Sequence, residues 1–197
     1  MNPTGTEPNR GTGAGGKNTN HYGKAFEHFT CHQERLLGSG FVKSSFKSCP
    51  KKASDFYLMK TYEDKTIVFV SQQGLKEYMK CKYNIQMLRN PDEAYIVEYK
   101  DGRKILKILE KKEQRVDGSA EEKLLNPGYL KREYEIVTGK EFVIQYALTV
   151  SEFLKHKFLT HAKFKIWKQI YEEDGVPLFF GTDENYFDQL DAWIQAE

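Results

Sequence analysis

The chain has 197 residues, of which 39% are hydrophobic and 14% are aromatic. This is the length of one ordinary domain, and the apolar content can build a core, which excludes wholesale disorder. The 30 Lys and Arg residues against 28 Asp and Glu residues give a net charge of +2, which neither requires nor excludes a polyanionic partner. No apolar run exceeds four residues, which is far short of a membrane span.

The first 20 residues are polar and glycine-rich, so residues 1–12 are expected to form a flexible lead-in and no secretory signal is predicted. Apolar residues spaced three and four apart predict a helix over residues 20–37. Residues 56–59 and 66–70 are typical of two strands of a hairpin, and residues 74–83 of a short helix.

The clearest local signal is Asp101-Gly102 between two β-rich runs, residues 93–99 and 103–110. It predicts a hairpin with a two-residue turn. The remaining predicted elements are helices over 119–126 and 128–138, a strand over 141–149, and helices near 151–156, 160–173 and 183–195. Together these elements indicate an α/β fold with a central mixed β-sheet flanked by helices.

Two segments resemble a phosphate-binding loop and a metal site but lack features that such sites require. Residues 11–18 have the glycine spacing of a phosphate-binding loop, but Asn18 stands where Ser or Thr would hold magnesium. Residues 1–10 also cannot form the buried strand that such a loop follows. His28 and His32 flank Cys31, but no second ligand pair has a usable spacing, so exposed or capping histidines are favoured over a metal site.

The segment that carries chemistry is the predicted hairpin at 93–110. Asp92 precedes its first strand, and Glu110 and Lys112 close its second, on one face because the side-chain period of a strand is two. Carboxylates hold Mg²⁺, which neutralises a phosphate and lowers the pKa of a bound water. A nearby lysine can orient that water and stabilise charge on phosphorus. The residue types therefore suit phosphodiester hydrolysis.

The Glu-x-Lys triplet carries no weight alone, because it recurs at 63–65, 98–100 and 121–123. Glu110 is singled out because it ends an apolar strand, where charges are costly to bury unless they are paired or metal-bound. A two-residue turn would place Glu93 opposite Glu110. Either a bulge shifts Asp92, or Asp92 lies just before the strand, or Glu93 is the first ligand. An ordinary ion pair at a solvated strand end is the alternative to a nuclease site.

Pro91-Asp92 with Glu110-Lys111-Lys112 resembles the signature of the PD-(D/E)xK nuclease superfamily. Several stretches resemble type II restriction endonucleases, especially those of large algal DNA viruses and their bacterial relatives; they are residues 13–20, 23–27, 91–95, 108–114 and 118–119. The resemblance implies one nuclease domain over residues 13–197, with a restriction-endonuclease-like mixed sheet.

The resemblance also implies roles for single residues. Asp92 and Glu110 correspond to metal ligands, and Lys112 to the residue that activates water. Glu27 on the first helix corresponds to a glutamate that completes the catalytic site. The implied cofactor is Mg²⁺, with one or two ions per site and Mn²⁺ as a substitute. The implied reaction is hydrolysis of duplex DNA at a short specific site.

The resemblance favours Asp92 over Glu93 as the first metal ligand. It also implies that the segment with Asn18 and Asn20 is ordered and contacts DNA. Gln114 is expected either to contact the attacking water or DNA, or to be a plain surface amide. Lys111 belongs to a basic stripe that would help to dock a phosphate backbone, together with Arg103, Lys104, Lys107, Lys112 and Arg115. A second basic cluster, in a predicted loop, consists of Lys43, Lys47, Lys51 and Lys52.

The expected partners are duplex DNA, a second copy of the chain and, in the cell, a cognate DNA methyltransferase, with no membrane. A homodimer is expected because a palindromic target matches two-fold symmetry. Three widely spaced cysteines, Cys31, Cys49 and Cys81, indicate reduced thiols and a cytoplasmic setting, including that of a virus-infected cell. The alternatives are another nuclease of this superfamily, for junction resolution or repair, and a non-catalytic nucleic-acid-binding module.

Overall fold

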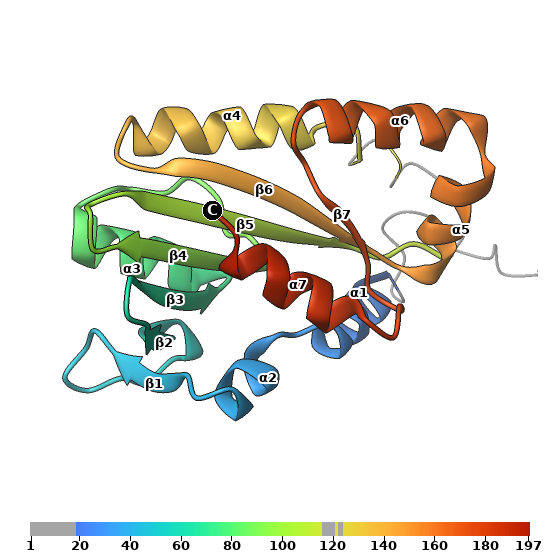
Figure 1. Cartoon of the computed structure of the whole chain (residues 1–197). Coiled ribbons are helices and arrows are strands. Elements are labelled where there is room, and N and C mark those ends of the chain that lie inside the picture. The colour runs from blue at the N-terminus through green and yellow to red at the C-terminus, as the bar shows by residue number, and fades with distance from the viewer. Residues whose placement is uncertain (1–18, 116–120, 122–123) are drawn as a thin grey trace, which may run out of the picture.

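The computed structural model describes residues 19–115, 121 and 124–197. Its centre is a seven-stranded mixed sheet in which the strands follow one another in sequence order, from β1 to β7 (Figure 1). Helices cover both faces of this sheet. The expected α/β class with a helix-flanked mixed sheet is therefore confirmed. None of the described helices has the length and apolar character that crossing a membrane requires.

The sheet changes from antiparallel to parallel at β5. Its strands are β1 (Val42–Ser45), β2 (Phe56–Thr61), β3 (Lys65–Ser71), β4 (Glu93–Tyr99), β5 (Lys104–Lys112), β6 (Val143–Val150) and β7 (Leu178–Phe180). The first five pair antiparallel, whereas β6 and β7 continue the sheet in parallel. Parallel neighbours need a crossover, and helices supply it between β5 and β6 and between β6 and β7.

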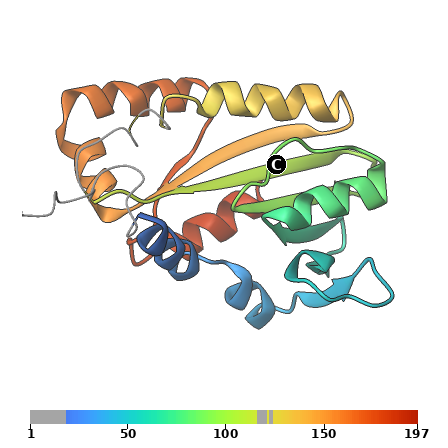
Figure 2. The same ribbon diagram turned by 180° about the vertical axis from the view of Figure 1, so that it is seen from behind.

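The helices form two layers. They are α1 (Thr19–Phe29), α2 (Gln33–Gly38), α3 (Gln73–Tyr83), α4 (Pro127–Thr138), α5 (Glu152–Thr160), α6 (Ala162–Glu173) and α7 (Tyr186–Gln195), with a short 3₁₀ turn at Ala53–Asp55. Side chains of α3 to α6 share one apolar core with the sheet, and those of α2 and α7 share another. Figure 2 shows α3 in front of the sheet and α7 behind it.

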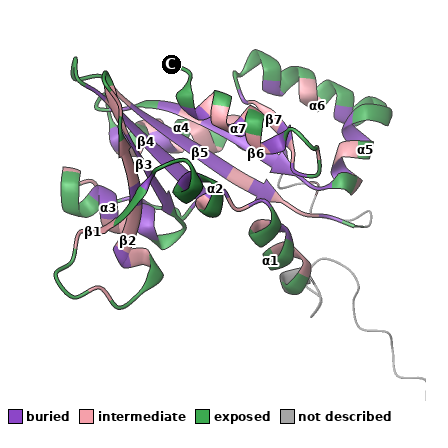
Figure 3. Ribbon diagram, turned by 60° about the horizontal axis from the view of Figure 1, so that its bottom comes forward, coloured by how far each residue is buried: buried purple, intermediate pink, exposed green. Residues whose placement is uncertain are grey.

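Burial on both faces explains the sequences of the central strands. Successive residues of β4 alternate between the two cores, so that Ala94 and Ile96 face α3 and α4 while Tyr95 and Val97 face α7. A strand covered on both sides is apolar throughout rather than alternating. The central strands are accordingly buried, while the outer sides of the helices are exposed (Figure 3).

Most predicted elements are present, with differences at their ends. The helix expected over 20–37 is split into α1 and α2, because residues 30–32 leave the helix to bond β4 and β5. The strands β1 and β7 were not predicted, and β1 begins within the segment expected to be a loop. Half of the helix expected over 119–126 lies outside the described residues.

The expected two-residue turn of the β4–β5 hairpin is wrong. The N–H of Tyr99 donates to the carbonyl of Arg103 at 2.9 Å, which leaves a loop of three residues between them that ends at Gly102. Gly102 has φ 93°, as a three-residue loop closed by a left-handed residue requires. The register therefore pairs Glu93 with Leu109, one residue away from the expected pairing.

Replacing Gly102 tests whether the three-residue loop, and with it the register of β4 and β5, depends on a residue with positive φ. Gly102→Ala should destabilise the protein by about 1–2 kcal/mol, because a Cβ is strained at positive φ. The measurement is urea unfolding followed by circular dichroism. Gly38→Ala is the matched control, since its added Cβ meets nothing within 4 Å; equal losses in the two variants would contradict this explanation.

Candidate active site

The corrected register places two carboxylates opposite each other. Asp92 lies just before β4, and extending the Glu93–Leu109 pairing by one residue places Asp92 opposite Glu110 of β5. Both side chains lie on the face that carries Ala94 and Ile108, since the period of a strand is two. Asp92 therefore needs no bulge to reach Glu110.

Each of these carboxylates is held through one oxygen. Asp92 Oδ2 accepts the backbone N–H of Lys111 at 2.7 Å, and Glu110 Oε2 accepts a hydrogen bond from Lys112 Nζ at 2.7 Å. The second oxygen of each carboxylate accepts no hydrogen bond from the residues that the structure describes. Burial raises the pKa of both carboxyl groups, although the charge of Lys112 opposes this rise in each.

Glu27 of α1 is a third carboxylate near Asp92. Burial raises its pKa, and the charge of Asp92 raises it further, whereas Lys111 and Lys112 lower it. Gly181, which follows β7, allows α1 to approach closely, because a Cβ at this position would lie 2.8 Å from the ring of Phe26. The structure thus brings together all four predicted catalytic residues, which are Glu27, Asp92, Glu110 and Lys112.

Glu93 has a different set of partners on the opposite face. Its Oε1 accepts hydrogen bonds from Lys111 Nζ at 2.7 Å and from the backbone N–H of His32 at 3.0 Å. Its Oε2 accepts one from the Tyr95 hydroxyl at 2.8 Å. Both oxygens are occupied and buried, so Glu93 is a structural residue and the interpretation of Glu93 as first metal ligand is not supported.

Two lysines of the predicted basic stripe lie inside the protein. Lys111 is buried against Glu93, which leaves its ammonium no surface for the DNA contact that was expected. Lys107 is fully buried and donates to the carbonyls of Trp193 and Ala196 at 2.6 and 2.7 Å. Burial lowers the pKa of Lys107 to about 8, with a smaller contribution from Lys65. The stripe is therefore interrupted at Lys107 and Lys111.

The remaining expected contact residues are Gln114, Asn18 and Asn20, of which the structure describes the side chain of Gln114. Gln114 follows the end of β5, is buried, and bonds the Ser151 hydroxyl through its backbone N–H and carbonyl. It borders a groove of about 360 Å³ between α1 and the start of α5, where Arg115 lies 3.7 Å from the ring of Tyr22. Asn18 lies outside the described residues, as does the side chain of Asn20.

Two buried phenols near Glu110 were not predicted. The hydroxyls of Tyr134 on α4 and Tyr146 on β6 have no hydrogen-bond partner among the described residues. Burial raises the pKa of both hydroxyls, and the charge of Glu110 raises it further. Buried polar groups are nearly always bonded, so these two mark an unusual environment. Their sequence positions give no sign of it, because tyrosines are common in apolar strands and helices.

The two opposed carboxylates fit a magnesium ion. Mg²⁺ is bound by hard oxygen ligands, often through one or two carboxylates while it keeps several waters. Asp92 and Glu110 offer one unbonded oxygen each on the same face. The described residues contain no group of three or more His, Cys, Asp or Glu side chains arranged to hold a metal ion.

The fold and site define an α/β protein with two opposed carboxylates and a lysine at one end of a mixed sheet. In comparisons with family models, curated proteins and solved structures, none matches this chain.

Breaking the buried ion pair should destabilise the fold strongly. Lys111→Met leaves the Glu93 carboxylate buried without its cation, which typically costs about 3–5 kcal/mol. Lys104→Met is the matched control, because its pair with Glu141 is partly exposed and such pairs are worth less than about 1 kcal/mol. Chemical unfolding of both variants measures the difference, and similar losses would argue against a structural role for Lys111.

The raised pKa values predict an unusual dependence of stability on pH. A carboxyl group whose pKa is higher in the folded than in the unfolded state takes up protons on folding. Its contribution to stability therefore grows as the pH falls through the raised pKa, and the charged form destabilises the fold at neutral pH.

Asp92→Asn should raise the free energy of unfolding at pH 7 by about 0.5–2 kcal/mol, since the amide oxygen can still accept the Lys111 N–H. Its advantage over the wild type should shrink as the pH falls through the raised pKa of Asp92. Thermal unfolding at several pH values measures this, with the exposed Asp188→Asn as the control for a change of charge. If Asp92→Asn is less stable than the wild type at pH 7, the prediction is contradicted.

Proposed function

We propose that the protein is a Mg²⁺-dependent endonuclease that hydrolyses phosphodiester bonds in duplex DNA. The observation that carries the proposal is the register of β4 and β5. It sets Asp92 opposite Glu110, with Lys112 on the same face and 2.7 Å from Glu110. Two carboxylates can hold the metal ion of a phosphodiester hydrolase and a lysine can stabilise the developing negative charge, and perturbed buried carboxylates are typical of functional sites.

Each residue has a defined task in this proposal. Asp92 and Glu110 would hold the ion through their unbonded oxygens, and the Lys111 N–H fixes the orientation of Asp92. A bound magnesium ion neutralises the phosphate and lowers the pKa of its water. Lys112 orients the nucleophilic water and stabilises negative charge on the phosphoryl oxygens. Glu27 supplies a third carboxylate from α1.

The finer assignment is a type II restriction endonuclease that acts as a homodimer on a short palindromic site. It rests on the resemblance of residues 13–20, 23–27, 91–95 and 108–114 to such enzymes. A homodimer places two sites on the two strands of a symmetric target. A methyltransferase that modifies the same target is then required in the cell.

Cleavage of DNA tests the proposal. Unmethylated phage-length duplex DNA is incubated with Mg²⁺ and the wild type, Lys112→Ala or Lys82→Ala. The wild type and Lys82→Ala should give discrete fragments, because Lys82 belongs to neither basic cluster and pairs with Glu98 at the other end of β4 from Asp92. Lys112→Ala should be slower by about 100-fold or more, the usual effect of removing a group that acts on the attacking water.

Other results would redirect the assignment. A smear that Lys112→Ala abolishes would indicate a nuclease of looser specificity, and cleavage of branched or mismatched DNA alone would indicate junction resolution or repair. Intact DNA in every lane, with Mn²⁺ and branched substrates also tried, would contradict a nuclease. Calorimetric titration with Mn²⁺ would then compare the wild type with Asp92→Ala. A non-catalytic binding module should show no Mn²⁺ site that this substitution removes.

A further inference from the structure

Gln72 occupies the third position of a row across the sheet. It follows the end of β3, where Ser71 pairs with Glu93, and its N–H donates to the carbonyl of Asp92 at 3.4 Å. Asp92 lies in turn opposite Glu110. Gln72, Asp92 and Glu110 therefore lie side by side at one level of the sheet: Gln72 follows β3, Asp92 precedes β4, and Glu110 lies near the end of β5.

The backbone of Gln72 is strained. Its φ of 45° and ψ of −122° lie in a region that residues with a Cβ avoid, and Asn84 is the other non-glycine residue with positive φ in the described part of the chain. The chain must turn sharply here, because α3 begins at once and a Cβ at Gly74 would lie 3.4 Å from Val70 Cβ. Glycine would make this turn without strain, so the glutamine side chain needs a separate reason.

The side chain reaches the candidate active site. Gln72 Nε2 donates a hydrogen bond to Glu27 Oε2 at 3.3 Å, from the sheet to helix α1. The charge of Asp92 raises the pKa of Glu27, so the two carboxylates repel each other, and the hydrogen bond from Gln72 opposes this repulsion. An amide is a suitable tether because it donates a hydrogen bond but carries no charge. The amide of Gln72 holds Glu27 Oε2 and leaves the negative charge of Glu27 available to attract a cation. A lysine in the same place would neutralise that charge.

We propose that Gln72 is a positioning residue that holds Glu27 near Asp92, so that the negative charge of Glu27 strengthens the binding of a divalent cation by Asp92 and Glu110. The inference rests on the proposed function, since it assumes that the carboxylates bind a metal ion. It explains the strained backbone of Gln72, between β3 and α3, by a role in metal binding in addition to its role in the fold.

The test is a calorimetric titration of the DNA-free protein with Mn²⁺, together with thermal unfolding. Gln72→Met keeps the length of the side chain and the strained backbone but removes the donor. Gln72→Gly removes both the donor and the strain. The Kd for Mn²⁺ should rise about tenfold in both variants, as for the loss of other residues that support metal ligands. Gln72→Gly should unfold at a higher temperature than Gln72→Met.

Asn84→Gly is the matched control, because it relieves a positive φ at the far end of α3 and should leave the Kd unchanged. An unchanged Kd for Mn²⁺ in both Gln72 variants would overturn the inference and leave the proposed function intact. Weaker binding of DNA without metal, with an unchanged Kd for Mn²⁺, would also overturn it and assign Gln72 to DNA. A wild type that binds no Mn²⁺ would instead overturn the proposed function, and the inference with it.

Discussion

The buried ion pair of Lys111 and Glu93 is the interaction on which the candidate site depends. Lys111 Nζ donates to Glu93 at 2.7 Å and to the carbonyls of Thr30 and Glu27 at 2.9 and 3.4 Å. It thereby ties the end of α1 to β4 and β5. Burying two charges is favourable only when good geometry and further hydrogen bonds compensate for the lost water. Here both groups are bonded on several sides, so the ends of β4 and β5 and of α1 are fixed together.

The pleat of the sheet separates this anchor from the chemistry. In β5, Glu110 and Lys112 lie on one face and Lys111 on the other, and Asp92 and Glu93 divide in the same way at the start of β4. The backbone connects the two faces, because the residue whose ammonium is buried also offers its N–H to Asp92. The orientation of a candidate metal ligand is thus set by an ion pair on the opposite side of the sheet.

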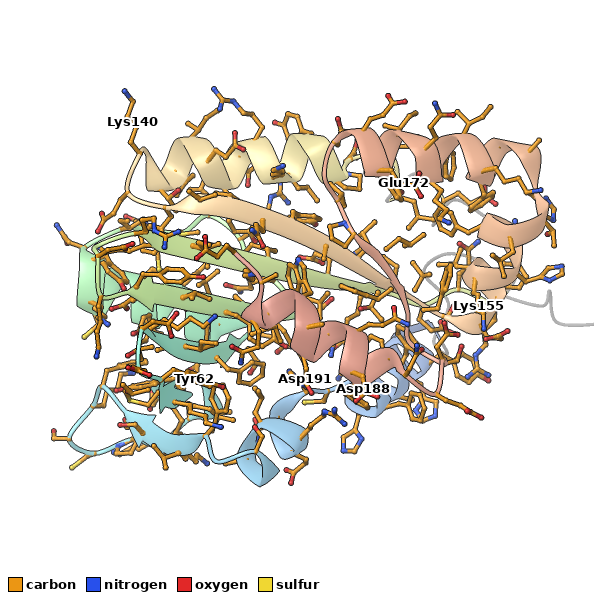
Figure 4. All side chains as sticks on the ribbon, viewed as in Figure 1. Tyr62, Lys140, Lys155, Glu172, Asp188 and Asp191 are labelled. Atoms are coloured by element: carbon orange, nitrogen blue, oxygen red, sulfur yellow. The ribbon has the colours of Figure 1, made fainter. Side chains whose placement is uncertain are left out.

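The anchor continues to helices α2 and α7. Tyr95 bonds Glu93, and the buried ring of His32 bridges Tyr95 Oη at 3.1 Å and Asp191 at 2.9 Å. His32 is therefore buried and not exposed; it occupies the N-cap position of α2, but its side chain makes no capping hydrogen bond there, whereas His28 is exposed. Arg35 of α2 bonds both Asp188 and Asp191, which lie on the side of α7 that faces α2 (Figure 4). An unbroken set of hydrogen bonds thus joins α7 to Asp92.

The sequence predicts those features that depend on pattern alone. Long apolar runs locate β2 to β6, and the spacing of Glu110 and Lys112 places them on one face. The hairpin register depended on one extra loop residue, which Asp-Gly does not specify. Lys111 and Lys112 are adjacent and identical in the sequence, and only tertiary packing decides which of them is buried. The strain at Gln72 and the unbonded phenols are properties of the folded chain, so no local pattern predicts them.

Several destabilising features gather at one end of an otherwise well-packed sheet. Asp92 and Glu110 are charged groups whose pKa values are raised by burial, and Gln72 adopts a backbone conformation that favours glycine. Tyr134 and Tyr146 bury hydroxyls near Glu110 that have no hydrogen-bond partner among the described residues, and so does Tyr99 at the other end of β4. Apolar or glycine residues at such positions would generally make the fold more stable. Strain and unpaired polar groups cluster where function requires them. This clustering supports a functional site around Asp92 and Glu110 on physical grounds that are independent of any family resemblance.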